Sequence, residues 1–400
     1  MNFSSRSIEL IFRENTELAL RLRDLIHKFT EDLKARCGKI TIRIMNFCGT
    51  HEWTTTHYGL RTLMPRDVEL VAGPGCPVCI TPAYYIDVAI KLALDGVKVY
   101  TYGDTYRLPT VRPKGAIRSL ADAKAAGADV TLVYSFLEAA RDSLKHGKDS
   151  IFVGIGFETI APAYAELIVQ RKVPENLKFL NIIRLTPPAA VYSINAVKSE
   201  VLEGKLLMGV IAPGHVSTIT GAKAWSVLAD EYKMPTVISG FEPIDVLMSI
   251  TEILRQFRRG EAKTVIQYKR AVTWDGNVKA QELMNMVFST VDAAWRGIGY
   301  IPKSGYRLRD KYYDKYDALN YFGVPDLTPE TWKYDLPPGC RCADVILGKA
   351  KPTDCKLFMK KCRPDSPWGP CMVSLEGSCS IWARCGVISE EVLQDLESTS

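Results

Sequence analysis

Strand-like and helical segments alternate along this 400-residue chain, and that alternation limits its fold more than any other feature. Between about residue 40 and residue 260, short apolar runs are separated by longer segments of helical pattern. Interleaved strands and helices of this kind indicate parallel sheets in an α/β fold. The strand-like runs are residues 40–47, 68–72, 98–102, 130–134, 150–154, 179–185, 206–212 and 236–239.

Eight strands over this length fit either one barrel or two four-stranded halves. We predict two halves, because residues 145–149 form a polar break that contains Gly147. The expected parts are an N-terminal helical segment, two α/β domains, and a helical, cysteine-rich domain in which residues 281–295 form a helix. Their boundaries are 1–36, 37–148, 149–262 and 263–400.

The N-terminal segment and the overall charge exclude several classes of protein. Charged residues such as Glu9, Arg13 and Glu14 interrupt the apolar pattern of the first 36 residues, so a signal peptide is not expected. No apolar run reaches membrane-spanning length, and we expect a cytoplasmic protein that does not bind membranes. The formal net charge of +6 comes without a lysine or arginine block, which argues against nucleic-acid binding.

The 11 cysteines fall into two groups. In a reducing compartment they are expected to serve metal or redox chemistry instead of structural disulfides. Two separate chemical centres are therefore predicted. The first group is Cys37, Cys48, Cys76 and Cys79, and the second is Cys340, Cys342, Cys355, Cys362, Cys371, Cys379 and Cys385.

Cys76 and Cys79 form a C-x-x-C pair in a turn rich in glycine and proline, directly after the strand at 68–72. Thr81 and Pro82 are interpreted as the N-cap and first residue of the next helix. At a helix start, at least one thiol is expected to have a lowered pKa, which suits disulfide exchange or metal binding. Half of a zinc site, or two ordinary turn cysteines, are the alternatives.

Cys48, His51 and Glu52 follow the strand at 40–47. The carboxyl ends of parallel strands line one edge of a sheet, where ligands bind. We therefore expect Cys48 to lie near Cys76 and Cys79, with His51 and Glu52 on the same loop.

Three later strands are also followed by polar residues in loops rich in glycine and proline, namely Glu158, His215 and Glu242. The glycines and prolines themselves are explained by the needs of the turns. The side chains of Glu158 and His215 are candidate site residues, and for His215 the alternative is a histidine whose hydrogen bonds are satisfied within the core.

A nucleotide site has only weak support. Gly154 and Gly156 resemble the start of a dinucleotide fingerprint, but Thr159 stands where the third glycine is needed.

The C-terminal cysteines have enough ligands for a metal centre. Four thiolates would hold either a cubane iron-sulfur cluster or a zinc ion, and the absence of any C-x2-C knuckle among them favours iron-sulfur. The remaining cysteines leave a pair for a disulfide beside the cluster. Such a disulfide would accept electrons and relay them to Cys76 and Cys79 by exchange.

Taken together, these motifs resemble the HypD family of hydrogenase maturation factors, over nearly the whole chain. The motifs are CGTHE at 48–52, GPGCPVC at 73–79, GFET at 156–159 with AP at 161–162, PGHVS at 213–217, KPTDC at 351–355 and CMVSLEGSC at 371–379. Isoleucine at position 160, where the family pattern has a second threonine, is a small departure.

The resemblance implies an accessory scaffold with redox activity, not a free-standing enzyme, on which the Fe(CN)2CO group of [NiFe]-hydrogenases is assembled. It implies two Rossmann-like domains around a cleft, and a [4Fe-4S] domain similar to that of ferredoxin:thioredoxin reductase. It further implies complexes with HypC and with HypE, the latter delivering cyanide from a thiocyanate.

The resemblance also implies roles for individual residues. Cys48 would hold the iron as a thiolate, with a partner thiol from HypC, and His51 would donate a hydrogen bond or proton to a bound ligand. Cys76 and Cys79 would be a redox pair. The implied cluster ligands are Cys340, Cys355, Cys362 and Cys379, and the redox-active neighbours are Cys342 and Cys371, although Cys340 and Cys342 could exchange roles; Cys37 and Cys385 receive no role.

Two other classes of function remain open. A stand-alone thiol-disulfide oxidoreductase would use the cluster and the Cys76/Cys79 pair without iron at Cys48. A zinc-stabilised binding protein would be colourless, whereas an iron-sulfur protein absorbs visible light.

Overall fold

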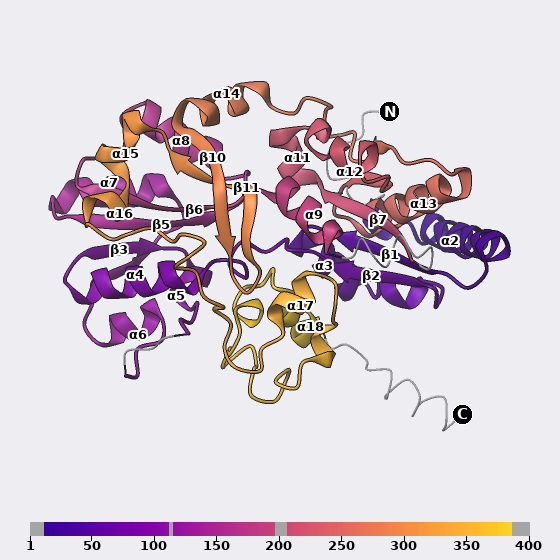
Figure 1. Cartoon of the computed structure of the whole chain (residues 1–400), viewed down its shortest axis with the longest axis horizontal. Coiled ribbons are helices and arrows are strands. Elements are labelled where there is room, and N and C mark those ends of the chain that lie inside the picture. The colour runs from indigo at the N-terminus through magenta and orange to yellow at the C-terminus, as the bar shows by residue number, and fades with distance from the viewer. Residues whose placement is uncertain (1–11, 112–114, 197–205, 386–400) are drawn as a thin grey trace.

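The computed structural model describes residues 12–111, 115–196 and 206–385, and it contains two parallel β-sheets (Figure 1). In spatial order the first sheet is β2-β1-β7-β8-β9 and the second is β4-β3-β5-β6. The first sheet consists of β1 (Thr41–Asn46), β2 (Val68–Ala72), β7 (Leu206–Pro213), β8 (Thr236–Ser239) and β9 (Thr264–Ile266), and the second of β3 (Lys98–Thr101), β4 (Val130–Leu132), β5 (Ser150–Gly156) and β6 (Leu177–Ile183).

The α/β class and the eight predicted strands are confirmed, and β9 is an additional strand that the sequence did not reveal. The predicted division near residue 148 is wrong. The chain forms β1 and β2, crosses over to build the whole second sheet, and then returns to pair β7 with β1. A boundary at 148 would separate β3 from its neighbour β5, in which Ser150 pairs with Lys98.

The polar break that suggested the boundary has a local cause. Helix α7 (Phe136–His146) ends there, and Gly147 takes the left-handed conformation, with φ of 66°, that commonly terminates a helix. The break therefore marks a helix end within the second sheet's unit.

Both sheets have the strand order of doubly wound folds. When the strands of each sheet are counted separately along the chain, the orders are 2-1-3-4-5 and 2-1-3-4. In such sheets, ligands bind beyond the carboxyl ends of the two strands where the order reverses. These two switch points lie between β1 and β7 in the first sheet and between β3 and β5 in the second.

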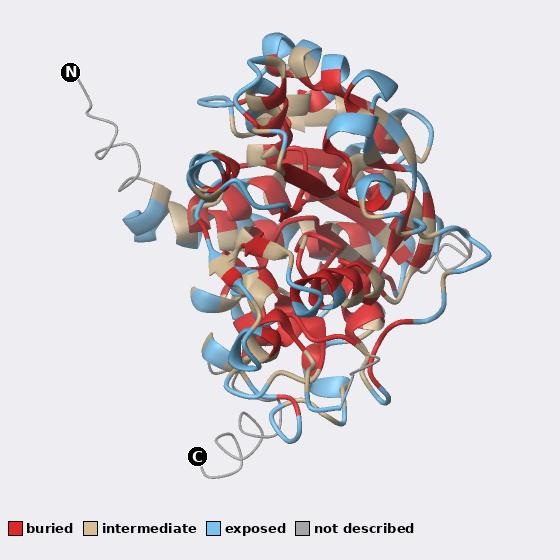
Figure 2. Ribbon diagram, turned by 90° about the vertical axis from the view of Figure 1, so that its left-hand side faces the viewer, coloured by how far each residue is buried: buried red, intermediate tan, exposed pale blue. Residues whose placement is uncertain are grey.

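Helices pack around both sheets (Figures 1 and 2). In Figure 2 the buried residues gather in the strands and the segments next to them, while the exposed residues lie on outer helices and loops. The helices before residue 263 include α2 (Thr16–Cys37), α3 (Gly49–His57), α4 (Ala83–Leu94), α5 (Gly103–Tyr106), α6 (Leu120–Ala125), α7, α8 (Ala161–Val169), α9 (Thr186–Asn195), α11 (Gly214–Thr220), α12 (Ser226–Asp230) and α13 (Pro243–Arg259), with short 3-10 helices η1 (Leu60–Leu63) and η2 (Ala222–Trp225).

The N-terminal helix packs against the first sheet's unit. Ile26 and Leu33 of α2 are buried in the same core as Ile250 and Ile253 of α13, beneath the first sheet. The first eleven residues of the predicted helical segment lie outside the described residues.

The segment after residue 263 differs from the expected helical domain. Helix α14 (Val278–Val287) ends earlier than predicted, and residues 288–295 form strand β10 (Phe288–Trp295) of an antiparallel hairpin with β11 (Gly299–Leu308). Phenylalanine, threonine, valine and tryptophan favour this strand. Figure 1 shows the hairpin running from α14 down the centre of the molecule to the cysteine-rich region.

Short elements follow the hairpin. They are α15 (Asp310–Tyr316), α16 (Ala318–Tyr321), α17 (Cys342–Ile346), η3 (Pro352–Asp354), η4 (Pro370–Met372) and α18 (Ser378–Cys385). Within the described ranges, no helix combines the length and apolar character needed to span a bilayer.

Candidate functional site

Cys48 lies at the carboxyl end of β1 and begins a helix. It is the N-cap residue of α3, and its Sγ accepts a hydrogen bond from the backbone N–H of Thr50 at 3.3 Å. The helix-start environment that the sequence suggested for Cys76 and Cys79 is therefore found at Cys48. His51 and Glu52 lie within the first turn of this helix, not on a loop.

His215 meets Cys48 at the switch point of the first sheet. Strands β1 and β7 are neighbours, and His215 follows β7 as Cys48 follows β1. The Sγ atom of Cys48 lies 3.8 Å from Nδ1 and 3.9 Å from Nε2 of the imidazole. A free, buried thiol thus lies beside a histidine at the edge where ligands bind in such sheets.

Burial keeps this pair neutral. Burial raises the pKa of Cys48 to about 11, and the backbone N–H groups of His51 and Thr50 oppose this increase only in part. Burial also lowers the pKa of His215. At neutral pH the thiol therefore keeps its proton and the imidazole is uncharged. A metal that binds Cys48 must displace that proton, because the thiolate is the ligand.

Two carboxyl groups interact electrostatically with His215, the buried Glu158 and the more exposed Glu376. Glu158 follows β5, at the switch point of the second sheet, and accepts a hydrogen bond from the backbone N–H of Thr186 at 2.7 Å. Burial raises its pKa to about 7, and burial also raises the pKa of Glu376. A positive charge on His215 would oppose this effect and lower the pKa of both Glu158 and Glu376.

Glu376 was not identified from the sequence. It belongs to the cysteine-rich segment, and its backbone contacts the start of α3 so closely that a Cβ at Gly49 would lie 2.5 Å from the Glu376 carbonyl oxygen. The glycine directly after Cys48 therefore lets this segment reach the site. A single carboxylate in a loop shows no periodicity, and only its place within the CMVSLEGSC run could have marked it.

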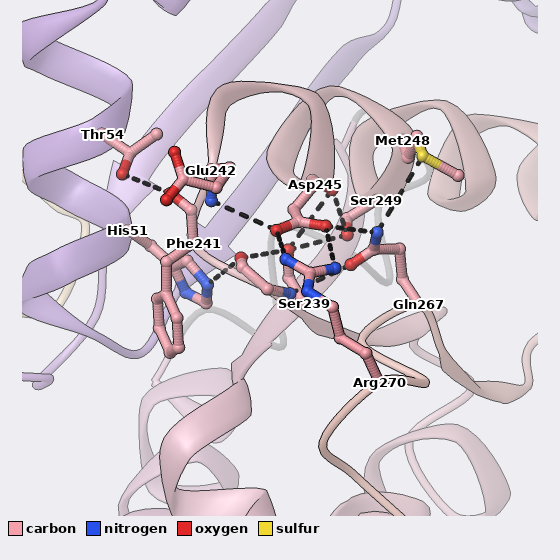
Figure 3. Close-up of polar contacts among 11 residues, drawn as sticks. His51, Thr54, Ser239, Phe241, Glu242, Asp245, Met248, Ser249, Gln267 and Arg270 are labelled. Carbon is pink, nitrogen blue, oxygen red and sulfur yellow. Dashed lines mark hydrogen bonds and ion pairs between the residues drawn. The ribbon is translucent and has the colours of Figure 1, made fainter. Parts of the chain in front are cut away.

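His51 does not present a proton to the site. It is fully buried, its Nε2–H donates to the carbonyl oxygen of Gly240 at 2.8 Å, and its ring stacks on Phe241 (Figure 3). Burial lowers its pKa to about 4, so the ring is neutral and Nδ1 carries no proton. The expectation that His51 donates to a bound ligand does not fit this arrangement, since its one proton is already engaged.

A hydrogen-bond network fixes the carbonyl that His51 contacts (Figure 3). The backbone N–H of Gly240 donates to Gln267, whose amide donates to Asp245 at 2.7 Å. Asp245 is fully buried, is paired with Arg270, and forms a capping box with Glu242 at the start of α13. Glu242 is thus placed at a helix cap.

Glu52 joins the first sheet to the cysteine-rich region. It is 2% exposed, and its carboxylate pairs with Arg61 at 2.8 Å and accepts hydrogen bonds from Asn46 and from Nε1 of Trp382 in α18. Three side chains thus occupy the carboxylate oxygens of Glu52, and these contacts are structural.

Cys76 and Cys79 are joined in a disulfide next to Cys48. A Cβ at Gly75 would lie 2.4 Å from the backbone nitrogen of Cys48, so only glycine allows these two segments to approach. Helix α4 begins at Ala83 with Pro82 as its N-cap, one residue later than predicted, and the Thr81 hydroxyl donates to the carbonyl of Pro77.

Six cysteines of the C-terminal group line one cavity, together with Leu357, Phe358 and Met372. Cys342 and Cys371 form a disulfide, and the other four are free thiols. The backbone N–H groups of Trp368 and Gly369 donate to Sγ of Cys362, each at 3.4 Å. The cavity-lining cysteines are Cys340, Cys342, Cys355, Cys362, Cys371 and Cys379.

The free thiols of this cavity disfavour each other's ionisation. Burial raises the pKa of Cys340 to about 11, and the charges of Cys355 and Cys362 would raise it further. The pKa of Cys379 is raised for the same reasons. In the described ranges, no three histidine, cysteine or acidic side chains converge closely enough to hold a single metal ion. The thiols instead surround a cavity.

Comparison with known proteins places the chain in a family. Residues 22–386 match the family described as HypD, "Hydrogenase formation hypA family". The chain belongs to the HypD family. A hydrogenase expression/formation protein of Methanocaldococcus jannaschii is 43% identical over 366 residues, covering 90% of this chain and 97% of that protein. Hydrogenase maturation factors HypD of Cupriavidus necator and Escherichia coli K12 are 38% and 34% identical, covering 87% and 90% of this chain and 90% and 95% of the relatives.

The [4Fe-4S] cluster implied by the HypD resemblance fits the residues of the cavity. Four free thiols are the ligand set that such a cluster requires. A positively charged iron core would also offset the mutual repulsion of four thiolates, and N–H donors to sulfur, as at Cys362, are a common feature of cluster sites. Cys340, Cys355, Cys362 and Cys379 would hold the cluster.

Most of the candidate residues of this HypD-family chain come together. Cys76, Cys79, Cys342 and Cys371 are buried in one hydrophobic core, against which Cys340 and Cys379 pack. Cys37 is exposed at the end of α2, and Cys385 lies at the end of α18 and does not line the cysteine cavity. Gly154 and Gly156, the weak nucleotide signal, face the side chains of Phe179 and Ile160 instead of an open loop.

Proposed function

We propose that this chain is the scaffold on which the Fe(CN)2CO group of [NiFe]-hydrogenases is assembled, with Cys48 as the thiolate that holds the iron. HypC and HypE are the proposed partners, in the cytoplasm. The observation that carries the proposal is the free, buried thiol of Cys48, 3.8 Å from His215 at the switch point of the first sheet. Thiolates are suitable ligands for an iron that carries cyanide and carbonyl.

The neighbours of Cys48 supply the acid-base chemistry that iron binding needs. The S–H bond breaks as the iron–sulfur bond forms, and the proton passes to His215. Glu158 and Glu376 favour the resulting imidazolium, since each interacts electrostatically with His215. The N–H groups of Thr50 and His51 stabilise the thiolate.

The cysteine-rich region is proposed to be a [4Fe-4S] domain beside two Rossmann-like units. The cluster would pass on single electrons, two in succession, from an external one-electron donor protein. The Cys342–Cys371 disulfide takes up two electrons and two protons to become a dithiol. That dithiol then reduces the Cys76–Cys79 disulfide by thiol exchange and is itself reoxidised. Supporting this route, both disulfides lie in one buried core.

Infrared spectroscopy of the chain purified with HypC and HypE tests the scaffold role. The wild-type complex should show cyanide and carbonyl bands. The Cys48→Ala complex should lack them, while Cys37→Ala, which removes an exposed cysteine far from the site, should keep them. Bands of wild-type intensity in Cys48→Ala would refute Cys48 as the iron ligand and favour Cys76 or Cys79.

A stand-alone thiol-disulfide oxidoreductase is the second candidate, favoured by the two disulfides and the cysteine cavity. It predicts catalytic reduction of a generic disulfide substrate that is unaffected by Cys48→Ala. The scaffold role predicts no such turnover.

A further inference from the structure

Arg296 is a fully buried cation at the tip of the β10–β11 hairpin. Its Nε donates to the backbone carbonyl of Asp335 at 3.0 Å and its Nη2 to that of Pro109 at 2.8 Å. Within the described residues its Nη1 has no hydrogen-bond partner and no carboxylate lies within ion-pairing distance of the guanidinium. A guanidinium stays charged in proteins, and burying a charge against neutral carbonyls alone is costly.

The carboxylate with the largest electrostatic effect on Arg296, that of Asp335, makes its hydrogen bonds elsewhere. Asp335 accepts backbone hydrogen bonds from Ala83 and from Gly297, at 2.9 and 2.8 Å, and not from the side chain of Arg296. The guanidinium therefore donates its hydrogen bonds to neutral carbonyls, while the carboxylates of Asp335 and Asp87 favour its charge electrostatically.

Arg296 lies between the Cys76–Cys79 and Cys342–Cys371 disulfides. Its backbone N–H donates to the carbonyl of Ile80, which follows Cys79 directly. The next residue, Gly297, is packed so tightly that a Cβ there would lie 3.1 Å from Cβ of Ala343, the neighbour of Cys342. Figure 1 shows the hairpin tip reaching the cysteine-rich region.

The hairpin tip also lies beside the cysteine cavity. Gly297, the neighbour of Arg296, packs against Ala343, and the residue before Ala343, Cys342, lines the cavity together with Cys340. A cluster held by four thiolates carries net negative charge, and one-electron reduction makes that charge more negative without forming or breaking a bond. A fixed cation nearby stabilises the reduced form, because net charge and surroundings set the potential of such clusters.

We propose that Arg296 is a positioning residue whose buried positive charge raises the reduction potential of the cluster in the cysteine cavity. This inference rests on the proposed function, which places a cluster there. Arg296 would make that cluster easier to reduce and would hold its charge beside the disulfides that receive electrons.

A redox titration of the full-length chain, reconstituted anaerobically and followed by electron paramagnetic resonance, tests this role. Dithionite would supply the electron. Arg296→Gln and Arg296→Met remove the charge and should shift the midpoint potential to lower values, while Arg296→Lys keeps the charge and should stay near wild type. Methionine is included because replacing a buried charge by an apolar side chain of similar size is often tolerated.

Arg184→Gln is the matched control. Arg184 is also a buried arginine, 3% exposed, and its Nε donates to the Ala294 carbonyl of the same hairpin. Loss of Arg184 should remove a contact with the hairpin without changing the midpoint potential. Unlike Arg296, Arg184 is not part of the hairpin tip that reaches the cysteine-rich region.

The outcomes separate this proposal from the proposed function. Unchanged potentials in both neutral variants would overturn the role of Arg296, as would an equal shift in Arg296→Lys or in Arg184→Gln. Loss of the cluster from all three Arg296 variants would likewise overturn it, since a purely structural role would then suffice. A wild-type chain that binds no iron and sulfide would instead refute the cluster itself.

Discussion

The two cysteine sites of this chain are built in different ways. Cys48 is a single free thiol at the end of a regular parallel strand, where a helix N-terminus and a histidine surround it. The cysteine cavity collects four free thiols and a disulfide from turns and short helices between residues 340 and 379. At the first site the sheet fixes the position of the sulfur; at the second, irregular segments do.

Under the proposed function, the Cys48 site binds iron transiently, and the cysteine cavity holds a permanent cluster. The Cys48 site is held by backbone pairing of β1 with its neighbours, so it should persist whether or not iron is bound. The cavity brings together thiols that oppose each other's ionisation, so a metal core should contribute much of its stability. Variants that change one site and leave the other intact test this comparison.

The largest expected effect is the loss of the proposed cluster. Cys355→Ala or Cys362→Ala removes one of four proposed thiolate ligands and should eliminate most bound iron and visible absorbance. Cys385→Ala, which changes a cysteine outside the cavity, should leave both unchanged. Iron and sulfide analysis with visible spectra is the measurement. Full iron content in both ligand variants would contradict the assignment of the cluster.

Sequence patterns located the Cys48 site better than they located its surroundings. Alternating apolar runs predicted the strands, and the rule that strand ends share an edge placed Cys48 near Cys76 and Cys79. The meeting of Cys48 with His215 depends on the pairing of β1 with β7, which was not predicted. Pairing between strands was not encoded in any local pattern, so the crossover from β2 to β3 and the return to β7 were missed. The polar turn at Gly147 terminates a helix, and from sequence alone it resembles a domain boundary.

The metal centre expected at the C-terminal cysteines was predicted from their number and spacing, and not from any predicted secondary structure. Motif resemblance divided six cysteines into four thiols and one pair, and the structure joins Cys342 to Cys371 in a disulfide. The hairpin that reaches this region was not foreseen, because residues 281–287 have a helical pattern that obscured the strand after it. Long-range contacts of this kind, such as Glu376 beside His215, depend on tertiary packing and leave no local signal.

The second prediction concerns the connection between the two sites. Glu52→Gln leaves Arg61 without its buried partner and weakens the contact with Trp382, so the free energy of unfolding should fall by about 3 kcal/mol. Urea denaturation measures it. Glu69→Gln, which breaks the more exposed pair with Arg43, should cost only about 0–1 kcal/mol. Equal losses in both variants would show that Glu52 does not join the two regions.

The third prediction uses the raised pKa of Cys48. Because burial raises this pKa to about 11, the thiolate fraction, and with it the rate of alkylation by iodoacetamide, should rise about tenfold per pH unit from pH 8 to pH 10. A small exposed thiol should level off above its pKa of about 8.5. Mass spectrometry of the peptide that contains Cys48 follows the reaction. A rate that is already constant at pH 8 would indicate an ionised thiol.

The smallest expected effect separates His215 from its neighbour Cys48. His215→Ala removes the proposed proton acceptor but leaves the thiol, the cluster ligands and the disulfides in place, so iron and sulfide content should match wild type. Without the imidazole, the proton of Cys48 has to leave by another route, and the infrared bands of the complex should appear several-fold more slowly. The measurement is a time course of band intensity, with the amount of soluble protein measured in parallel. It distinguishes a His215 that accepts a proton from a His215 that only stabilises the core. If soluble protein is lost instead, His215 stabilises the core; if both are unchanged, another group accepts the proton, and Glu158 or Glu376 becomes the next candidate.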